Sequence, residues 1–177
     1  MAEFLTDIKT LRERARQKIE EGPITSSYGA DRDRVIEVLN EALATEIVCV
    51  LRYKRHYFTS RGIHSQTVAA EFLQHATEEQ GHADELALRI TQLQGLPNFD
   101  PEGLTTRSHA EYDDSETIRE MLTEDLVAER VAIESYSEII RWLGDNDVTT
   151  RRMLETILAV EEEHADDLLN LLDETEA

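Results

Sequence analysis

Hydrophobic residues recur at three- and four-residue steps through most of the chain, which is the spacing of helices with one apolar face. Glycine and proline are scarce and clustered, so the breaks between the periodic segments are easy to place. A short amphipathic helix is expected over residues 3–21, where Gly22 and Pro23 end the pattern. No segment has the alternation of a β-strand. The pattern predicts four long helices, over about residues 31–59, 65–94, 115–143 and 149–173.

The connections between these helices differ in length, and this difference predicts the topology. A short break near Gly62 separates the first two long helices, and a tight turn near Gly144 separates the last two. A long connector begins at Gly95 and contains two of the three prolines. Two helical hairpins joined by a long crossover form a four-helix bundle. We therefore expect an all-α protein with an N-terminal helical extension over residues 1–30 and a bundle domain over residues 31–177.

Composition and charge narrow the function classes. A length of 177 residues with 40% hydrophobic residues suits one domain with its own core. The chain carries 38 acidic against 18 basic residues, a formal net charge of −20, so it repels phosphate backbones and no nucleic-acid partner is expected. We expect no membrane association and a cytoplasmic location, because neither a run of about 20 apolar residues nor the apolar core of a signal peptide is present.

The cysteine content limits the kind of metal site. Cys49 is the only cysteine, so an internal disulfide and a Cys-x-x-Cys site within the chain are both excluded. Any metal ion would therefore bind carboxylates and imidazoles. We expect Cys49 itself to be a small buried hydrophobic residue, because it lies next to the apolar stripe of its helix.

An internal repeat carries the candidate chemistry. Residues 46–53 (EIVCVLRY) match residues 129–136 (ERVAIESY), and residues 78–86 (EEQGHADEL) match residues 161–168 (EEEHADDL). Each hairpin thus supplies one isolated glutamate on its first helix and a Glu-x-x-His pair on its second. The i, i+3 spacing puts the two members of each pair on one helix face. The candidate metal ligands are Glu46, Glu79, His82, Glu129, Glu161 and His164.

The charge of these positions is unfavourable without a counterion. Glu46 and Glu129 lie on the apolar stripes of their helices, so their carboxylates are expected to point inward. Four carboxylates in one core would repel each other and lose their charge. Two divalent cations neutralise four carboxylates, and neutral imidazoles complete the coordination. We expect two iron ions per chain, with manganese as the alternative metal.

Other histidines and tyrosines have weaker signals. Tyr53 and Tyr136 each follow an inward glutamate by two helical turns, so they are expected near the metals or in the core. His56 lies ten residues after Glu46 and is a candidate for an ion route or a transient site. The remaining histidines have no repeated partner and are interpreted as surface or ordinary core residues: His64, His75 and His109.

Residues 32–173 resemble the ferritin-like superfamily, and within it the bacterioferritin group. The strings LNEALATEI, EEQGHADEL and LQGLPN carry the resemblance, together with the spacing of Glu46, Tyr53 and His56. The resemblance implies a ferritin-like four-helix bundle that oxidises Fe(II) with O2 or H2O2 and stores iron in a protein shell. It also implies a role at the centre for Tyr53. By position, Glu46 and Glu129 would be terminal ligands, Glu79 and Glu161 would bridge the ions, and His82 and His164 would bind one ion each.

The sequence departs from the bacterioferritin pattern in two places. Gln80 stands where bacterioferritins have the methionine that binds haem, so haem is not expected. No fifth helix of the kind found in 24-subunit cages is expected after the last long helix. In this respect the chain is similar to Dps-like miniferritins of 12 subunits, although their cysteine pair is absent. A homo-oligomeric shell of 12 or 24 subunits is therefore expected.

Two other functions fit the same ligand pattern. The first is a di-metal oxidase or manganese catalase-like enzyme that stores nothing, because the ligand set alone does not distinguish it from a ferritin. The second is a metal-free structural bundle, in which the inward carboxylates would be protonated or solvated.

Overall fold

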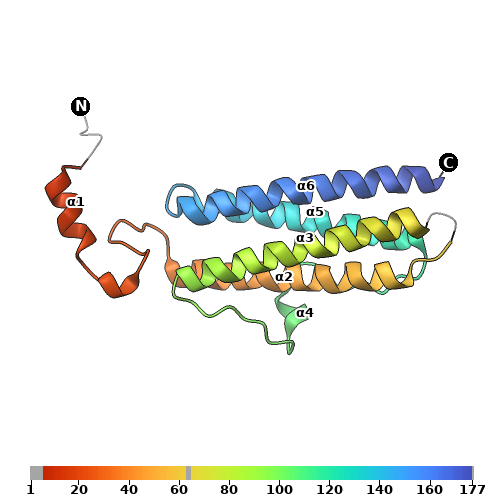
Figure 1. Ribbon diagram of the computed structural model, residues 1–177, viewed down its shortest axis with the longest axis horizontal. Helices are drawn as coiled ribbons and strands as arrows, with labels where there is room; N and C mark the ends of the chain where they lie inside the picture. The colour runs from red at the N-terminus through yellow and green to blue at the C-terminus, as the bar shows by residue number, and fades with distance from the viewer. Residues whose placement is uncertain (1–5, 63–64, 177) are drawn as a thin grey trace.

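A computed structural model describes residues 6–62 and 65–176, and this part of the chain is all-helical, with no strand. The expected all-α class is therefore confirmed. Four long helices form the bundle, and three short helical segments lie outside it (Figure 1). The elements are α1 (Ile8–Ala15), the 3-10 helix η1 (Ile19–Glu21), α2 (Arg32–Thr59), α3 (Ser65–Gln92), α4 (Leu104–Arg107), α5 (Ile118–Leu143) and α6 (Val148–Glu176).

The four long helices pair as two hairpins, α2 with α3 and α5 with α6. The hairpins meet through α2 against α5 and through α3 against α6. The crossover from α3 to α5 runs along the outside of the bundle, and its short helix α4 contacts α2 (Figure 1). This is the topology that the connection lengths predicted, and it places the first helix of each hairpin on one side and the second on the other.

Local sequence determines where several helices begin and end. The Thr117 hydroxyl accepts a hydrogen bond from the Glu120 backbone amide, and the Glu120 side chain accepts one from the Thr117 backbone amide. This reciprocal cap starts α5 at Ile118, a little later than the expected residue 115. At the end of α3 the backbone comes very close to α2. A Cβ on Gly95 would lie 2.7 Å from Cγ2 of Ile36, so only glycine fits there without a shift.

The N-terminal segment differs from the expected continuous helix over residues 3–21. Its residues 3–5 lie outside the described residues, and the rest forms α1 and η1 with a break at Lys18, whose φ is 49°. Asp7 caps α1 by accepting hydrogen bonds from the backbone amides of Lys9 and Thr10. None of the α1 residues is buried, so no packing supports a longer helix. The division of the chain at residue 30 stays a prediction.

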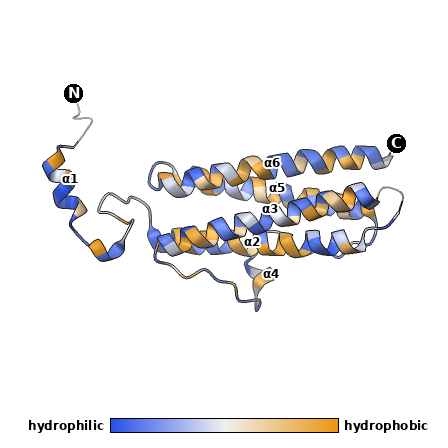
Figure 2. Cartoon of the chain, viewed as in Figure 1, coloured by the Kyte–Doolittle hydropathy of each residue, from blue (hydrophilic) through white to orange (hydrophobic). Residues whose placement is uncertain are grey.

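The core lies inside the bundle and has two hydrophobic clusters. One contains Leu39, Leu43, Leu86 and Ile90, and the other contains Phe72 and Met121 with their neighbours. Hydrophobic and hydrophilic residues alternate along each long helix, as expected of helices with one face in a core (Figure 2). Cys49 is buried, as expected. No described helix is long and apolar enough to span a membrane.

A buried polar network attaches α2 to α5 and to the crossover. Arg52 donates hydrogen bonds to the Glu111 carbonyl at 2.6 Å and to the Asp125 carboxylate at 3.2 Å. His56 is fully buried, and its Nδ1 lies 2.7 Å from Oδ2 of Asp125. Its Nε2 lies 3.4 Å from Asp113 in the crossover. These contacts give His56 a structural role, and the suggested ion route at this residue stays a prediction.

Candidate metal centre

The bundle brings all six predicted ligands together, one or two from each long helix. Glu46 comes from α2, Glu129 from α5, and the two Glu-x-x-His pairs from α3 and α6. The four glutamates and His164 are at most 1% exposed, and His82 is 8% exposed. All six side chains therefore lie in the interior, which for Glu46 and Glu129 is the inward orientation that the apolar stripes predicted.

Potential ligand atoms of these residues form two overlapping groups. Within each group, one ligand atom per residue lies within 4.8 Å of every other. The two groups share Glu79 and Glu161, while Glu46 and Glu129 belong to one group each. The arrangement has room for two cations with two carboxylates common to both. The groups are Glu46, Glu79, His82 and Glu161, and Glu79, Glu129, Glu161 and His164.

Each histidine directs one ring nitrogen at the carboxylates of its group. His82 Nδ1 lies 3.0 Å from Oε1 of Glu161, 3.4 Å from Oε2 of Glu46 and 3.6 Å from Oε2 of Glu79. His164 Nδ1 lies 3.4 Å from Oε1 of Glu79 and 3.5 Å from Oε2 of Glu161. The same nitrogen of each ring therefore faces the space that a cation would occupy.

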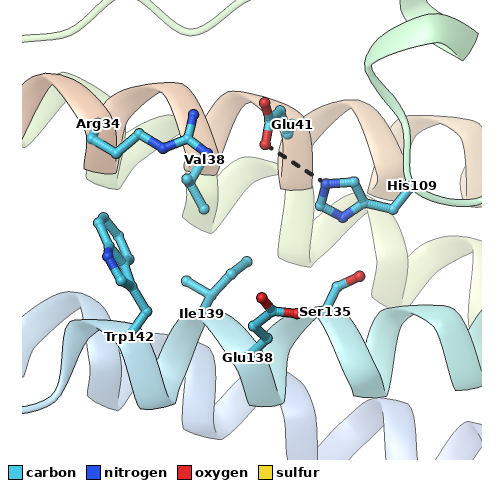
Figure 3. A pocket seen from close by; sticks show the side chains of 8 residues that line it. All are labelled: Arg34, Val38, Glu41, His109, Ser135, Glu138, Ile139 and Trp142. Atoms are coloured by element: carbon cyan, nitrogen blue, oxygen red, sulfur yellow. Dashed lines mark ion pairs between the residues drawn. The ribbon is translucent and has the colours of Figure 1, made fainter.

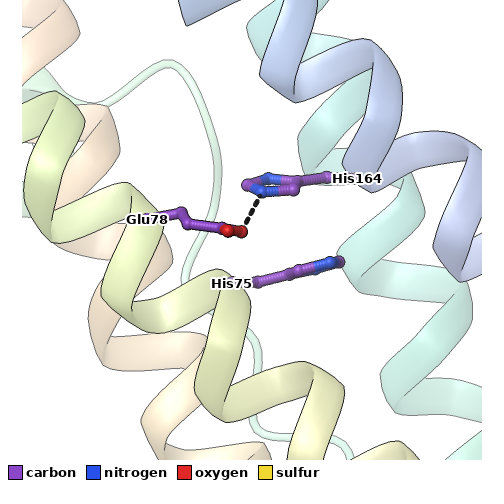
Figure 4. A group of neighbouring side chains, drawn as sticks. All are labelled: His75, Glu78 and His164. Atoms are coloured by element: carbon purple, nitrogen blue, oxygen red, sulfur yellow. Dashed lines mark hydrogen bonds and ion pairs between the residues drawn. The ribbon is translucent and has the colours of Figure 1, made fainter.

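The other nitrogen of His164 has a partner on the neighbouring hairpin. His164 Nε2 lies 2.9 Å from Oε2 of Glu78, which comes from α3 (Figure 4). A carboxylate in this place fixes the orientation and the tautomer of a metal-binding histidine. The contact leaves Nδ1 of His164 free to bind an ion.

Two buried tyrosines cross between the hairpins to the isolated glutamates. The Tyr53 hydroxyl on α2 donates a hydrogen bond to Glu129 on α5, and the Tyr136 hydroxyl on α5 donates one to Glu46 on α2. Both tyrosines are at most 2% exposed. Both tyrosines therefore lie in the core beside candidate ligands, and their proximity to bound metals stays a prediction.

The pKa values at the centre indicate how the negative charge of the buried carboxylates is compensated when no metal is bound. Burial raises the pKa of Glu79 and of Glu129 well above the usual range, and neighbouring glutamates raise both further. Burial opposes charge on the histidines, but the carboxylates facing them raise the pKa to about 12 for His82 and about 9 for His164. Burial also opposes charge on Glu161, but the histidines lower its pKa to about 2. Protons therefore supply the positive charge that the buried carboxylates need.

The polar atoms that face the centre fit a pair of cations. They are buried and form no hydrogen bonds within the described part of the chain, although such groups are normally paired in a protein interior. Carboxylate oxygens and imidazole nitrogens are the donors that iron and manganese accept. The atoms are Oε2 of Glu46, both carboxylate oxygens of Glu79 and Glu161, Oε2 of Glu129, and Nδ1 of His82 and His164.

Sequence reasoning missed two residues beside the centre. Glu78 is the partner of His164, and His75 stacks on the His164 ring with centroids 4.0 Å apart (Figure 4). The interpretation of His75 as a core residue agrees with its full burial. Burial, and then the proximity of His164, lowers the pKa of His75 to about 3. The four-residue spacing from His75 to Glu79 puts both on one helix face, and this is the signal that could have found His75.

A surface hollow of about 430 Å³ lies apart from this centre, between α2 and α5 (Figure 3). Glu41 and His109 line it, with His109 Nε2 3.7 Å from the Glu41 carboxylate. Trp142 lies at its other end (Figure 3). None of the six candidate ligands lines the hollow, so it has no part in the candidate centre. The structure thus places His109 near the surface, as expected, while His64 lies outside the described residues.

Comparisons with known proteins match most of the chain. A family model described as Ferritin-like domain matches residues 36–177. A bacterioferritin from Brucella melitensis is 34% identical over 143 residues, which cover 79% of this chain and 83% of the relative. A nutrient stress-induced DNA-binding protein from a Synechococcus species is 32% identical over 137 residues, covering 75% and 77%. Among solved structures, the bacterioferritin-related protein of Bacteroides fragilis, described as a dodecameric thioferritin, has a TM-score of 0.80 and 33% identity, covering 84% and 89%.

Proposed function

The chain belongs to the ferritin-like family, and from this premise we propose that it oxidises Fe(II) at a di-iron centre inside each bundle and stores the iron in a protein shell. The observation that carries the proposal is the pair of overlapping ligand groups that share Glu79 and Glu161. Two adjacent Fe(II) ions give up one electron each. Together they supply the two electrons, and two protons from solvent complete the reduction of O2 to H2O2 or of H2O2 to water.

The six residues take distinct roles in this proposal. Glu46 and Glu129 each belong to one group and would be terminal ligands, whereas the shared Glu79 and Glu161 would bridge the two ions. His82 and His164 would bind one ion each through Nδ1, the nitrogen that faces the carboxylates. These roles match those that the bacterioferritin resemblance implied.

Tyr53 has a direct link to the centre through Glu129. Its hydroxyl orients this terminal carboxylate, and we assign Tyr53 the catalytic role implied by the resemblance. Burial, followed by the negative charge of Glu129, raises the pKa of Tyr53 well above the usual range, so the hydroxyl keeps its proton at neutral pH. Tyr136 holds Glu46 in the same way.

The proposed partners and cofactors are limited to the iron, its oxidant and further copies of this chain. Manganese is the alternative metal for the same ligands. Haem is not part of the proposal, because Gln80 stands at the position of the haem-binding methionine and its amide donates to Asp84 at 3.1 Å. A shell of 12 subunits is supported by the dodecameric relative from Bacteroides fragilis, with 24 subunits as the bacterioferritin alternative.

Nucleic acid is not a proposed partner, although one relative is named as DNA-binding. The formal net charge of −20 would have to be overcome by a local basic surface, and electrostatic attraction to phosphates supplies most non-specific DNA affinity. A cytoplasmic location stays a prediction from the sequence.

Iron loading tests the proposal. Fe(II) is added anaerobically in increasing amounts per chain, O2 is admitted, and soluble Fe(III) is followed by absorbance. Continued formation of soluble Fe(III) far beyond two ions per chain is expected of a storing shell. Saturation at about two ions per chain would instead establish the oxidase or catalase-like alternative.

Two variants test the centre itself. Glu79→Ala and Glu161→Ala each remove a ligand shared by the two groups, so each is expected to abolish rapid oxidation, and circular dichroism checks that the helical content is kept. Glu163→Ala, at an exposed position of α6, is the matched control and is expected to oxidise iron at the wild-type rate. Unchanged rates in the first two variants would refute the assignment.

A further inference from the structure

A second cluster of potential ligands lies where α3 packs against α6, outside the six-residue centre. Glu71 and His75 are one helical turn apart on α3, and Asp167 comes from α6. One ligand atom of each lies within 4.8 Å of the others. None of these residues belongs to the ligand pattern that the two hairpins repeat.

The spacing of the cluster suits one small cation. His75 Nε2 lies 3.3 Å from Oε1 of Glu71 and 3.9 Å from Oδ2 of Asp167. Ligand atoms that bind one metal ion at about 2.1 Å and at right angles are about 3 Å apart. The first distance already meets this requirement, and a small rotation of the Asp167 side chain would meet it for the second.

His75 provides independent evidence for a ligand. Its side chain is fully buried, and neither ring nitrogen forms a hydrogen bond within the described residues. The ring is held between two neighbours, stacked on His164 at 4.0 Å and edge-on to Tyr53 at 5.2 Å. Figure 4 shows the His75 and His164 rings facing each other. A buried imidazole without a hydrogen bond is costly, so a bound ion at Nε2 would compensate for it.

The two carboxylates of the cluster lie between the buried His75 ring and the solvent. The side chains of Glu71 and Asp167 are 25% and 41% exposed, whereas that of His75 is 0% exposed. An ion can therefore reach the cluster from outside without passing through the core. Burial raises the pKa of Glu71, and the nearby charges of Asp167 and Glu78 raise it further, so this face has an excess of negative charge.

We propose that Glu71, His75 and Asp167 form a third cation site in each subunit, which binds a divalent transition-metal ion at the face where α3 meets α6. One imidazole with two carboxylates selects ions such as Fe(II), Mn(II), Co(II) or Zn(II) over Mg²⁺ and Ca²⁺, which prefer oxygen ligands alone. The site is separate from the six-residue centre but adjoins it, because His75 contacts His164. Its existence does not depend on iron oxidation at that centre.

Co(II) binding to the metal-free protein tests the proposal. Equilibrium dialysis counts the bound ions, and anomalous diffraction from Co(II)-soaked crystals locates them. The double variant Glu71→Gln/Asp167→Asn removes two carboxylates at partly exposed positions. Its control, Glu85→Gln/Asp173→Asn, makes the same change of charge at exposed positions of the same two helices. Wild type and control are expected to bind one more Co(II) per subunit than the double variant, whose affinity at the third site falls at least tenfold.

A second variant tests the imidazole. His75→Phe keeps an aromatic ring against His164 and Tyr53 while it removes Nε2, and it is expected to lose the same Co(II) ion. If His75→Phe does not fold, the carboxylate variant decides alone. Equal Co(II) binding by wild type and the double variant, or no anomalous peak among the three side chains, overturns the proposal. Wild-type crystals with a peak among the three side chains but none at the six-residue centre would refute the di-iron proposal and leave the third site in place.

Discussion

The α2/α3 hairpin and the α5/α6 hairpin supply the same ligands, but they surround them with different residues. With Glu79 aligned to Glu161, the residue before the ligand is Glu78 in one hairpin and Val160 in the other. Glu78 reaches His164 across the bundle, whereas valine has no group that can hydrogen-bond to His82. The same alignment pairs the metal-ligand candidate His75 with Ile157.

The repeat therefore produces two sites with the same kinds of ligand, but their histidines differ in exposure and in hydrogen-bond partner. His164 is 1% exposed and has a carboxylate partner, whereas His82 is 8% exposed. A carboxylate behind a metal-binding histidine raises its basicity and holds its ring in place. We therefore expect the ion at His164 to be bound more tightly than the ion at His82.

Removing Glu78 is expected to have the largest effect on the difference in metal affinity between the His164 site and the His82 site. Glu78→Ala is expected to weaken metal binding at the His164 site about 10- to 100-fold, because the histidine loses its orienting partner. A Co(II) titration of wild type should show two unequal affinities at the centre, and the variant should bring the two values together. Glu162→Ala, which changes an exposed glutamate next to the other shared ligand, is the control and should leave both affinities unchanged. If Glu78→Ala instead weakened Co(II) binding at the lower-affinity site, the assignment of the higher-affinity site to His164 would be contradicted.

The two tyrosines allow a finer test, because each contacts the isolated glutamate of a different site. Tyr53→Phe leaves Glu129 without a donor and should weaken the His164 site, whereas Tyr136→Phe should weaken the His82 site through Glu46. A lost hydrogen bond to a charged group predicts a change of roughly tenfold in each affinity. The same Co(II) titration measures both.

Double variants that combine Glu78→Ala with each tyrosine change show which tyrosine acts on the same metal site as Glu78. Tyr53→Phe and Glu78→Ala act on one site, so their combined effect is expected to deviate from the sum of the single effects. Tyr136→Phe and Glu78→Ala act on different sites, and their effects should add. If Tyr53→Phe and Glu78→Ala were additive while Tyr136→Phe and Glu78→Ala were coupled, Tyr136 would belong to the His164 site and Tyr53 to the His82 site.

The sequence was sufficient for the features that are repeated or periodic. Glu46 and Glu129 could be placed inside the bundle because apolar neighbours fix the face on which they lie, and the Glu-x-x-His pairs follow from helix geometry. Contacts between hairpins were not predictable in the same way. The link from Glu78 to His164 depends on how α3 packs against α6, and a single unrepeated glutamate gives no signal of it.

The helix break at Lys18 was missed for a related reason. Hydrophobic spacing alone favoured a continuous helix over residues 3–21, but a helix of this length needs packing to persist. The exposed Ile8 and Ile19 show that the apolar face of this segment does not reach the core. Periodicity predicts a helix face, and burial decides whether that helix forms in full.

The pH dependence of stability is the prediction with the smallest expected effect, and it tests both sites together. In the metal-free protein the pKa of His164 is raised to about 9 and that of His82 to about 12, both above the unfolded value near 6.5. A raised histidine pKa contributes stability that is complete below pH 6.5 and is lost as the pH rises through the folded-state value. The raised pKa values of Glu79 and Glu129 act in the same direction.

The melting temperature of the chelator-treated protein is therefore expected to fall between pH 7 and pH 9, by about 3 °C per pH unit for each proton held only by the folded state. His164→Gln and His82→Gln should each reduce this slope, because each removes one such proton. The contribution of His164 ends near pH 9, whereas that of His82 continues above it, so only His82→Gln should flatten the curve above pH 9. Bound divalent metal replaces these protons, and its stabilising effect should grow as the pH rises. A melting temperature that is constant or rises from pH 7 to pH 9 would contradict the proton-holding state of the empty centre.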